Sequence, residues 1–200
     1  MPSLLDQVDG RTSVVDEVLT GSLDEGEVLT GVDLVGCTLR GGSLAGASLA
    51  GVRLEGCTVE QVGLSRVRLP DSVLDGCTFT GCKALATSWS MLREPVLAPD
   101  PCTWVDCQLS MGSFGGLDLT GARFERCVLS DADFDGAVLR EAVVDDCSLA
   151  GARLVRVDLR EADLRTARDY VVDARDAQLA GLRVDPVGAL GLLAPFGVVV

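Results

Sequence analysis

Apolar side chains recur every five residues through most of this chain. From Leu34 to Val184, 31 positions have numbers ending in 4 or 9, and all but three of them are apolar. A second set of small or apolar residues lies two positions before these, as at Val32, Cys37 and Ala47. Inward residues are therefore separated by two and then three positions, whereas a helix needs three and four and a flat strand needs two throughout.

This alternation predicts short extended sides joined by corners. A spacing of two keeps both side chains on one face of an extended segment, and a spacing of three requires a turn before the next side. Glycine often follows the apolar residue by two positions, as at Gly36, Gly41 and Gly46, where a corner needs permissive backbone. Because one phase holds for about 150 residues, the pattern favours a solenoid over a sandwich of ordinary strands.

The eight cysteines indicate how many sides close one coil. All of them occupy the small inward position, and most intervals between them are twenty residues. Four sides of five residues would stack such positions directly, about 4.8 Å apart. Stacked thiols point the same way, which is poor geometry for a disulfide, and a structural zinc site would need CxxC spacing, which is missing. We therefore expect inert packing thiols, in vertical files Cys37–Cys57–Cys77, Cys82–Cys102 and Cys107–Cys127–Cys147.

Composition argues against several function classes. The chain has no histidine, nucleophile elbow or phosphate-binding glycine loop, so we expect neither catalysis, nor a cofactor, nor a metal. Its net charge of −13 argues against direct nucleic-acid binding, which needs a basic face, and favours partners with basic surfaces. With no signal-peptide pattern and no run of 18 apolar residues, we expect a soluble, cytoplasmic protein without a membrane segment.

Units such as ASLAG, ARFER and ADFDG resemble the A(D/N)LXX signature of pentapeptide-repeat proteins. The resemblance implies an all-β solenoid, a right-handed quadrilateral β-helix, over residues 31–185. Residues 1–30 would form an N-terminal segment and the first coil or coils. Leu19 and Leu29 are in phase with Leu34, but Asp24 intervenes. Either a bulge lies near 29–33, or clean coils start only there.

The C-terminal sequence GLRVDPVGALGLLAPFGVVV resembles the tail of the Qnr and MfpA group of pentapeptide-repeat proteins, with Gly181, Arg183, Val184 and Asp185 matching the lead-in. Asp185 is expected to cap a short helix whose first turn holds Pro186. The resemblance implies a tail-to-tail homodimer through residues 186–200; the alternative is a monomeric cap over the last coil. The expected interface residues are Ala189, Leu190, Leu192, Leu193, Phe196 and Val198.

The same resemblance implies a function. Members of this group interact with DNA gyrase, a type II topoisomerase, and are associated with fluoroquinolone resistance, a form of antibiotic resistance. A rod with rows of carboxylates would act as a DNA mimic where gyrase binds DNA. The alternatives are an interaction scaffold with an unrelated partner, or ordinary charged outward positions. Residues 100–146 hold ten acids and three bases, and the candidate contact residues are Asp106, Asp118, Asp131, Asp133, Asp135, Glu141, Asp145 and Asp146.

The pattern breaks in TSWSMLREPVLAPDPCTW, where Glu94 and Pro99 fall on inward positions. A carboxylate inside an apolar rod would cost several kcal/mol unless paired. The segment from about 90 to 101 is therefore expected to leave the rod as a loop, or to form one distorted coil. Ala84 and Trp104 are twenty residues apart, so the register should return in phase. The functional loop would be centred on Met91, Leu92, Arg93 and Glu94, and a smaller break is expected at Asp169.

Overall fold

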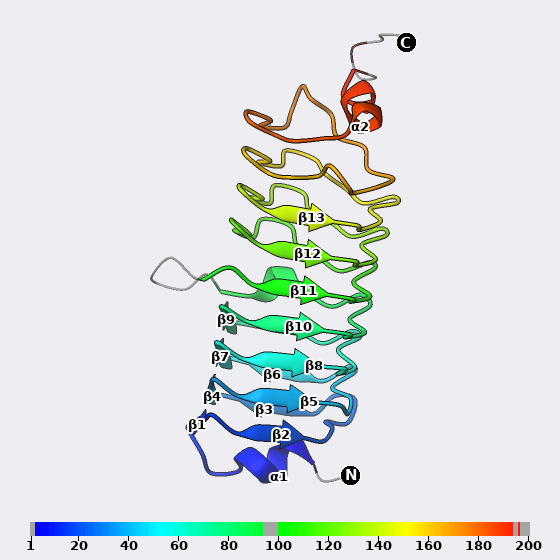
Figure 1. Ribbon diagram of the computed structural model, residues 1–200. Coiled ribbons are helices and arrows are strands. Elements are labelled where there is room, and N and C mark those ends of the chain that lie inside the picture. Colours follow the sequence, from blue (N-terminus) through cyan, green and yellow to red (C-terminus); the bar gives the residue numbers. More distant parts are fainter. Residues whose placement is uncertain (1–2, 94–99, 194–195, 197–200) are drawn as a thin grey trace.

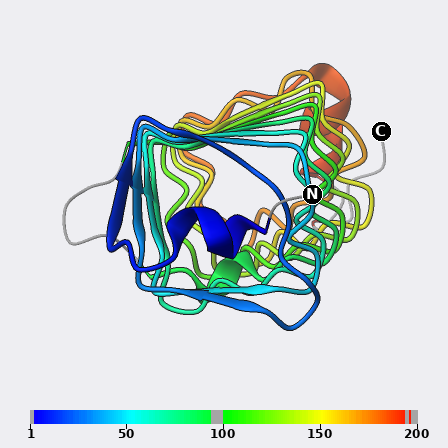
Figure 2. The ribbon, with the colours of Figure 1, turned by 90° about the horizontal axis from the view of Figure 1, so that it is seen from below.

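A computed structural model shows a rod of stacked coils with a four-sided cross-section (Figures 1 and 2). The structure describes residues 3–93, 100–193 and 196. Every strand pairing in this part of the chain is parallel, and partners in the first four coils lie twenty residues apart, as Leu34 does from Leu54. The quadrilateral β-helix predicted from the sequence is confirmed.

We name three faces of the rod after their first strands and call the fourth the bridge face. Within the described residues, the β1 face is a four-stranded sheet of β1 (Ser13–Val15), β4 (Asp33–Val35), β7 (Arg53–Glu55) and β9 (Val73–Asp75). The β2 face holds seven strands: β2 (Val18–Thr20), β5 (Thr38–Arg40), β8 (Thr58–Glu60), β10 (Thr78–Thr80), β11 (Thr103–Val105), β12 (Arg123–Glu125) and β13 (Val143–Asp145). The β3 face holds β3 (Val28–Thr30) and β6 (Ser48–Ala50), and the fourth, the bridge face, is joined by isolated bridges such as Ser43 to Gly63.

One coil is five residues longer than its neighbours. Phe79 pairs with Trp104 across 25 residues, and the Ala84 N–H bonds the carbonyl of Gln108. The inward register returns in phase as expected, since Trp104 and Leu109 are buried, but Trp104 stacks on Phe79 and not on Ala84. Arg93 still donates to Ser72 with the normal offset, whereas Gly76 donates to Asp100 with the longer one, so the extra residues enter between Arg93 and Asp100.

This longer coil changes the cysteine files. Thr103 donates to the Cys77 carbonyl and Gln108 donates to the Cys82 carbonyl, which places Cys102 above Cys77 and Cys107 above Cys82. The three expected files are therefore corrected to two files of four. They are Cys37–Cys57–Cys77–Cys102 and Cys82–Cys107–Cys127–Cys147.

The two ends of the repeat region are also more regular than expected. Val14 and Leu19 are already inward, so the coils begin at β1 rather than near residue 31. The slip that the sequence placed near 29–33 lies earlier, where Leu23 takes the inward position and leaves Asp24 exposed. Asp169 is exposed with a φ of 63°, so its carboxylate avoids the core.

The core changes from aliphatic to aromatic along the rod. Leucine and valine fill the early coils, and an apolar cavity lies among residues such as Leu44, Leu69 and Trp89. Beyond it, parallel-stacked rings form two columns that meet edge to face, with centroids 4.8–6.3 Å apart. The two aromatic columns are Phe79–Trp104–Phe124 and Trp89–Phe114–Phe134.

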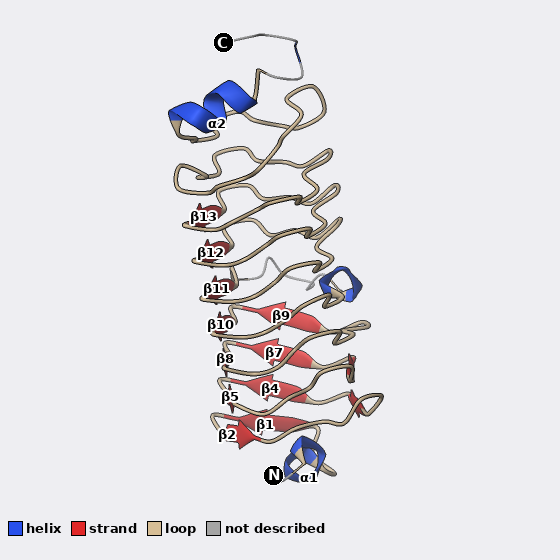
Figure 3. Cartoon of the chain, turned by 90° about the vertical axis from the view of Figure 1, so that its right-hand side faces the viewer, coloured by secondary structure: helices blue, strands red, loops and turns tan. Residues whose placement is uncertain are grey.

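Helices lie at both ends of the rod (Figure 3). Helix α1 (Leu4–Val8), capped by Ser3, crosses the N-terminal opening in Figure 2 and buries Leu4 and Val8. Helix α2 (Pro186–Gly191) begins as expected, with the Asp185 carboxylate accepting from the Gly188 N–H at 2.8 Å. Among the described residues, no helix has the length and apolar character needed to cross a bilayer.

Candidate partner-binding surface

The β1 face has the most acidic surface of the rod. We take it as the stacked segments 13–16, 33–36, 53–56, 73–76, 100–101, 118–121, 138–141, 158–161 and 178–181, which the pairings of β1, β4, β7 and β9 and the bridges from Asp118 to Gln178 align. These described residues hold nine carboxylates and three arginines, a net charge of −6 out of −13 for the chain. The acids are Asp16, Asp33, Glu55, Asp75, Asp100, Asp118, Glu141, Asp158 and Glu161.

Most of these carboxylates have no basic partner among the described residues. Arg53 contacts Glu55 at 3.0 Å and Asp75 at 3.6 Å, and Arg160 contacts Asp158 at 2.6 Å. The guanidinium of Arg160 lowers the pKa of Asp158 by hydrogen bonding to its carboxylate. In the described part of the chain, no ion pair reaches Asp16, Asp33, Asp100, Asp118, Glu141 or Glu161.

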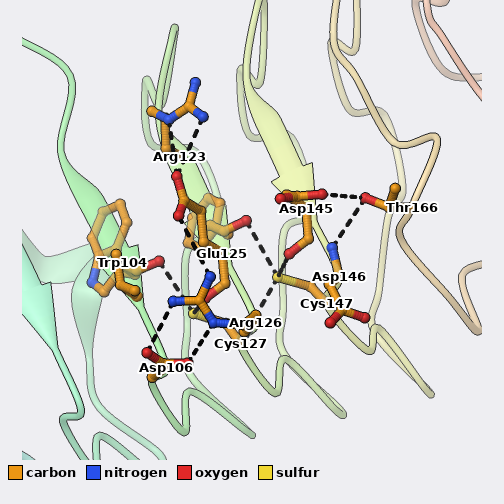
Figure 4. A network of polar contacts seen from close by, with 12 residues as sticks. Trp104, Asp106, Arg123, Glu125, Arg126, Cys127, Asp145, Asp146, Cys147 and Thr166 are labelled. Atoms are coloured by element: carbon orange, nitrogen blue, oxygen red, sulfur yellow. Dashed lines mark hydrogen bonds and ion pairs between the residues drawn. The ribbon is translucent and has the colours of Figure 1, made fainter.

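The β2 face has a different charge arrangement. Its stacked segments, from 18–21 to 183–186, hold seven carboxylates and five arginines in the described residues, a net charge of −2. Figure 4 shows part of this face, where Arg126 bonds Asp106 at 2.7 Å and the Thr166 hydroxyl donates to Asp145 at 2.7 Å. The hydrogen bond from Arg126 lowers the pKa of Asp106. Most charged side chains of the β2 face thus form ion pairs or hydrogen bonds within the rod.

The eight acids singled out from the sequence do not form one row. Asp118 and Glu141 lie on the β1 face, whereas Asp131 lies on the bridge face. The β2 face carries Asp106, Asp145 and Asp146, and the β3 face carries Asp133 and Asp135. Several of these acids form ion pairs with arginines: Arg126 pairs with Asp106, Arg153 with Asp133 and Asp135, Arg156 with Asp135, and Arg168 with Asp146.

Sequence reasoning missed the seven other acids of the β1 face, namely Asp16, Asp33, Glu55, Asp75, Asp100, Asp158 and Glu161. A signal was present, because Asp118 and Asp158 are forty residues apart and Glu141 and Glu161 are twenty apart, which stacks each pair on one face. The five-residue insertion shifts the later residues of this face relative to those of the first four coils. Residues of the two halves therefore cannot be aligned by a constant interval of twenty residues.

The structure places the expected loop residues mainly in the coil. Met91 ends the 3-10 helix η1 (Trp89–Met91), and its carbonyl accepts from Asp71. Leu92 packs against the core and the Arg93 N–H donates to Ser72. Glu94 and Pro99, which the sequence pattern assigned to inward positions, lie outside the described residues. Arg93 and Asp100 flank this undescribed segment and both lie at the β1 face; when Arg93 is added to the stacked segments counted above, the net charge of the face is −5.

The apolar tail residues are partly exposed. Leu190 is 47% exposed, Leu193 39% and Phe196 59%, and Val187, which the sequence reasoning did not include, is 75% exposed. Ala189 is also exposed, whereas Leu192 packs against the core; Val198 lies outside the described residues. Helix α2 is held against the last coil, since a side chain at Gly188 would collide with the Tyr170 hydroxyl.

The carboxylate spacing of the β1 face limits what it can bind. Nine carboxylates spread over nine stacked segments give about one per coil, or one per ~4.8 Å of rod. A single strand of B-DNA carries one phosphate per about 3.4 Å, so the face approaches one strand and not both. Among the described residues, no group of three or more acids and cysteines is placed to hold a metal ion. The arrangement therefore suits a basic macromolecular surface.

Comparisons with known proteins bear on the repeats and the fold. Family models of pentapeptide repeats match residues 113–163 and 28–66. A solved structure of a trypsin-treated variant of QnrB1, a plasmid-mediated fluoroquinolone resistance protein, is 18% identical; the match covers 92% of this chain and 98% of that chain with a TM-score of 0.58. HetL, a pentapeptide repeat protein involved in heterocyst differentiation regulation from the cyanobacterium Nostoc, is 20% identical over 91% of this chain and 92% of its own, with a TM-score of 0.42. A search of curated proteins found no match.

Proposed function

We propose that this chain, which belongs to the pentapeptide-repeat proteins, is a DNA mimic that binds DNA gyrase through its β1 face and protects the enzyme from quinolone-like or natural-product inhibitors. The observation that carries the proposal is the row of unpaired carboxylates on one side of a straight rod. Such a protein acts where gyrase acts, in the cytoplasm, and binds its partner without any chemical step.

Electrostatics favour the β1 face over the other three. Counted over the stacked segments alone, the net charge of the β1 face is −6, against −2 on the β2 face. It is −1 on the β3 face, with segments from 28–31 to 173–176, and −1 on the bridge face, with segments from 23–26 to 168–171. A DNA-binding groove is lined by lysine and arginine, which attract a carboxylate row most when those carboxylates are not already neutralised. The proposed contact should therefore weaken steeply as salt rises, since exposed charges are screened over about 10 Å at 0.1 M salt.

The likeness to QnrB1 supports the proposal in a limited way. At 18% identity it shows a shared fold, and the name of that structure describes a fluoroquinolone resistance protein. The transfer of that role to this chain is our inference and rests on the charge of the β1 face. An interaction scaffold with an unrelated partner is the competing function. The ion pairs of the β2 face favour it, because they show that outward charges also stabilise the rod itself.

The test is a supercoiling assay with purified gyrase, with and without ciprofloxacin. The first variant carries Asp118→Asn, Glu141→Gln and Glu161→Gln, three unpaired acids of the β1 face. We expect it to lose both gyrase inhibition and drug rescue, because it removes at least half of the net charge of the face. Unmodified protein should lose its effect between low and physiological salt.

The matched control removes the same charge from other faces. It carries Asp71→Asn, Asp131→Asn and Asp176→Asn, which also form no ion pair in the described part of the chain. This variant should behave like the unmodified protein. Equal loss in both variants would show a net-charge effect without a specific face, and no inhibition or rescue by the unmodified protein would leave the scaffold function.

We also propose that α2 and the residues after it join two copies tail to tail. Val187, Leu190, Leu193 and Phe196 present apolar surface at one end of the rod. Leu190→Asp should convert a dimer to a monomer in light scattering after size-exclusion chromatography. Val171→Asp is the control, because Val171 is 76% exposed but lies outside α2. A monomeric unmodified protein would exclude the dimer.

The insertion between Arg93 and Asp100 provides a separate test of loop function. Deleting residues 94–98 removes five residues, which restores a twenty-residue coil and keeps the later coils in phase. If the inserted segment contacts gyrase, this variant should lose drug rescue while its melting temperature changes little. Unchanged rescue would show that the segment has no part in protection.

A further inference from the structure

The cysteine file Cys37–Cys57–Cys77–Cys102 places thiols directly above one another. The Cys57 thiol donates to the Leu34 carbonyl at 3.2 Å, and the Cys77 thiol donates to the Leu54 carbonyl at 3.4 Å. The Cys37, Cys57 and Cys77 thiols each donate to the same position of the coil beneath, so these three side chains share one orientation, and the backbone pairing adds Cys102 to the same file. Neighbouring sulfurs are therefore separated mainly along the rod axis, by the coil spacing of about 4.8 Å.

This separation suits a cation that takes two collinear sulfur ligands. A metal–thiolate bond is about 2.3 Å long, so two such bonds in line span about 4.6 Å. Thiolate ligands select soft metals.

Cys102 makes one end of this file reachable. Of the eight cysteines, all within the described residues, Cys102 alone is not fully buried. It follows the inserted segment directly, where Asp100 and Pro101 are exposed. The backbone bond from the Thr103 N–H to the Cys77 carbonyl places Cys102 directly above Cys77.

We propose that Cys77 and Cys102 form a two-coordinate site for a soft divalent cation of the mercury(II) type. Binding breaks two S–H bonds, forms two metal–sulfur bonds and releases two protons to water, with no change of oxidation state. Two thiolates neutralise a divalent cation, so the product adds no net charge to the apolar core. Silver(I) would leave one negative charge in the core and should bind less tightly. Zinc(II) needs four ligands, which the described residues do not provide.

The binding test uses the full-length reduced protein and mercury(II) in the presence of excess glutathione as a competing thiol. We expect one equivalent to be retained in native mass spectrometry and X-ray absorption to show two sulfur neighbours in line. Cys102→Ala should abolish retention. Cys37→Ala, at the closed end of the same file, should retain it, because Cys37 is fully buried and the Cys77–Cys102 pair remains intact.

Thermal unfolding gives a second readout that does not depend on the competitor. A ligand held only by the folded state raises the melting temperature, so mercury(II) should stabilise the unmodified protein and Cys37→Ala, but not Cys102→Ala. Zinc(II) should have no effect on any of them. The proposal is overturned if glutathione removes all of the metal, if Cys102→Ala binds as tightly as the unmodified protein, or if the bound metal has three or more sulfur neighbours.

Discussion

Replacing Phe114 with alanine removes the ring at the centre of the aromatic core. Phe114 is fully buried, and its ring lies between Trp89 at 5.8 Å and Phe134 at 4.9 Å, measured between centroids. It also meets Trp104 and Phe124 edge to face. The coils above and below are fixed by backbone hydrogen bonds, so they cannot close around the space that the ring leaves.

The expected cost follows from this environment. A buried phenylalanine replaced by alanine costs about 3–5 kcal/mol of unfolding free energy. Each aromatic pair contributes about 0.5–1.5 kcal/mol beyond buried area, and Phe114 makes four such pairs. We therefore expect a loss of about 4–5 kcal/mol. For a chain of this size, 1 kcal/mol shifts the melting temperature by about 2–4 °C, so the transition should fall by about 8–20 °C.

Urea unfolding followed by tryptophan fluorescence is the assay, because Trp89 and Trp104 both contact Phe114. Circular dichroism recorded in parallel tests whether the whole rod unfolds together or coils open separately. Phe114→Leu is the control, since it keeps an apolar side chain and should cost about 1–1.5 kcal/mol. A loss below about 2 kcal/mol for Phe114→Ala, or equal losses for the two variants, would refute a rigid aromatic core.

Three further substitutions, one with a matched control, test other parts of the rod. Gly42→Ala should lower the unfolding free energy by more than about 2 kcal/mol, because a Cβ there meets the backbone of the coil beneath. Its control is Gly41→Ala, which has a similar positive φ but open space around the Cβ and should cost about 1 kcal/mol; urea unfolding measures both. Leu69→Phe should extend an aromatic column into the adjoining cavity and raise the melting temperature by about 2–4 °C, and a lower value would mean overpacking. Asp158 has a lowered pKa beside Arg160, so its stabilisation is present above about pH 4 and is lost as pH falls through the depressed pKa. Asp158→Asn should therefore destabilise the protein at pH 7, and the difference from the unmodified protein should shrink as pH falls through the depressed pKa, in urea titrations at each pH.

The five-residue period predicted the length of each side of the rod, and the twenty-residue spacing of the cysteines predicted that four sides close a coil. The inward positions of Leu34, Cys37 and Leu39 follow from the alternation of two and three, and the structure buries all three. The helix at Pro186 could also be predicted, because an aspartate before a proline is a local signal that does not depend on distant contacts. Local rules of this kind repeat along the chain, so one correct reading of the unit fixes most of the fold.

Stacking across the insertion could not be predicted, because it depends on which residue of one coil pairs with which residue of the next. Phe79 pairs with Trp104 across 25 residues, and this single offset moves Cys102 above Cys77 and moves every later residue relative to the first four coils. A period of five is unchanged by the insertion of five residues, so the pattern itself carries no sign of the shift.

For the same reason, the candidate surface could be predicted only in part from the sequence. The sequence alone determined that acids such as Asp106 and Asp118 point outward, since they lie between inward positions. Only the tertiary structure decided that Asp118 has no basic partner in the described part of the chain while Asp106 bonds Arg126, twenty residues later on the next coil. Inward or outward direction is set by neighbours in the chain, whereas the face that a charge shares, and the cation that neutralises it, are set by the backbone register between coils.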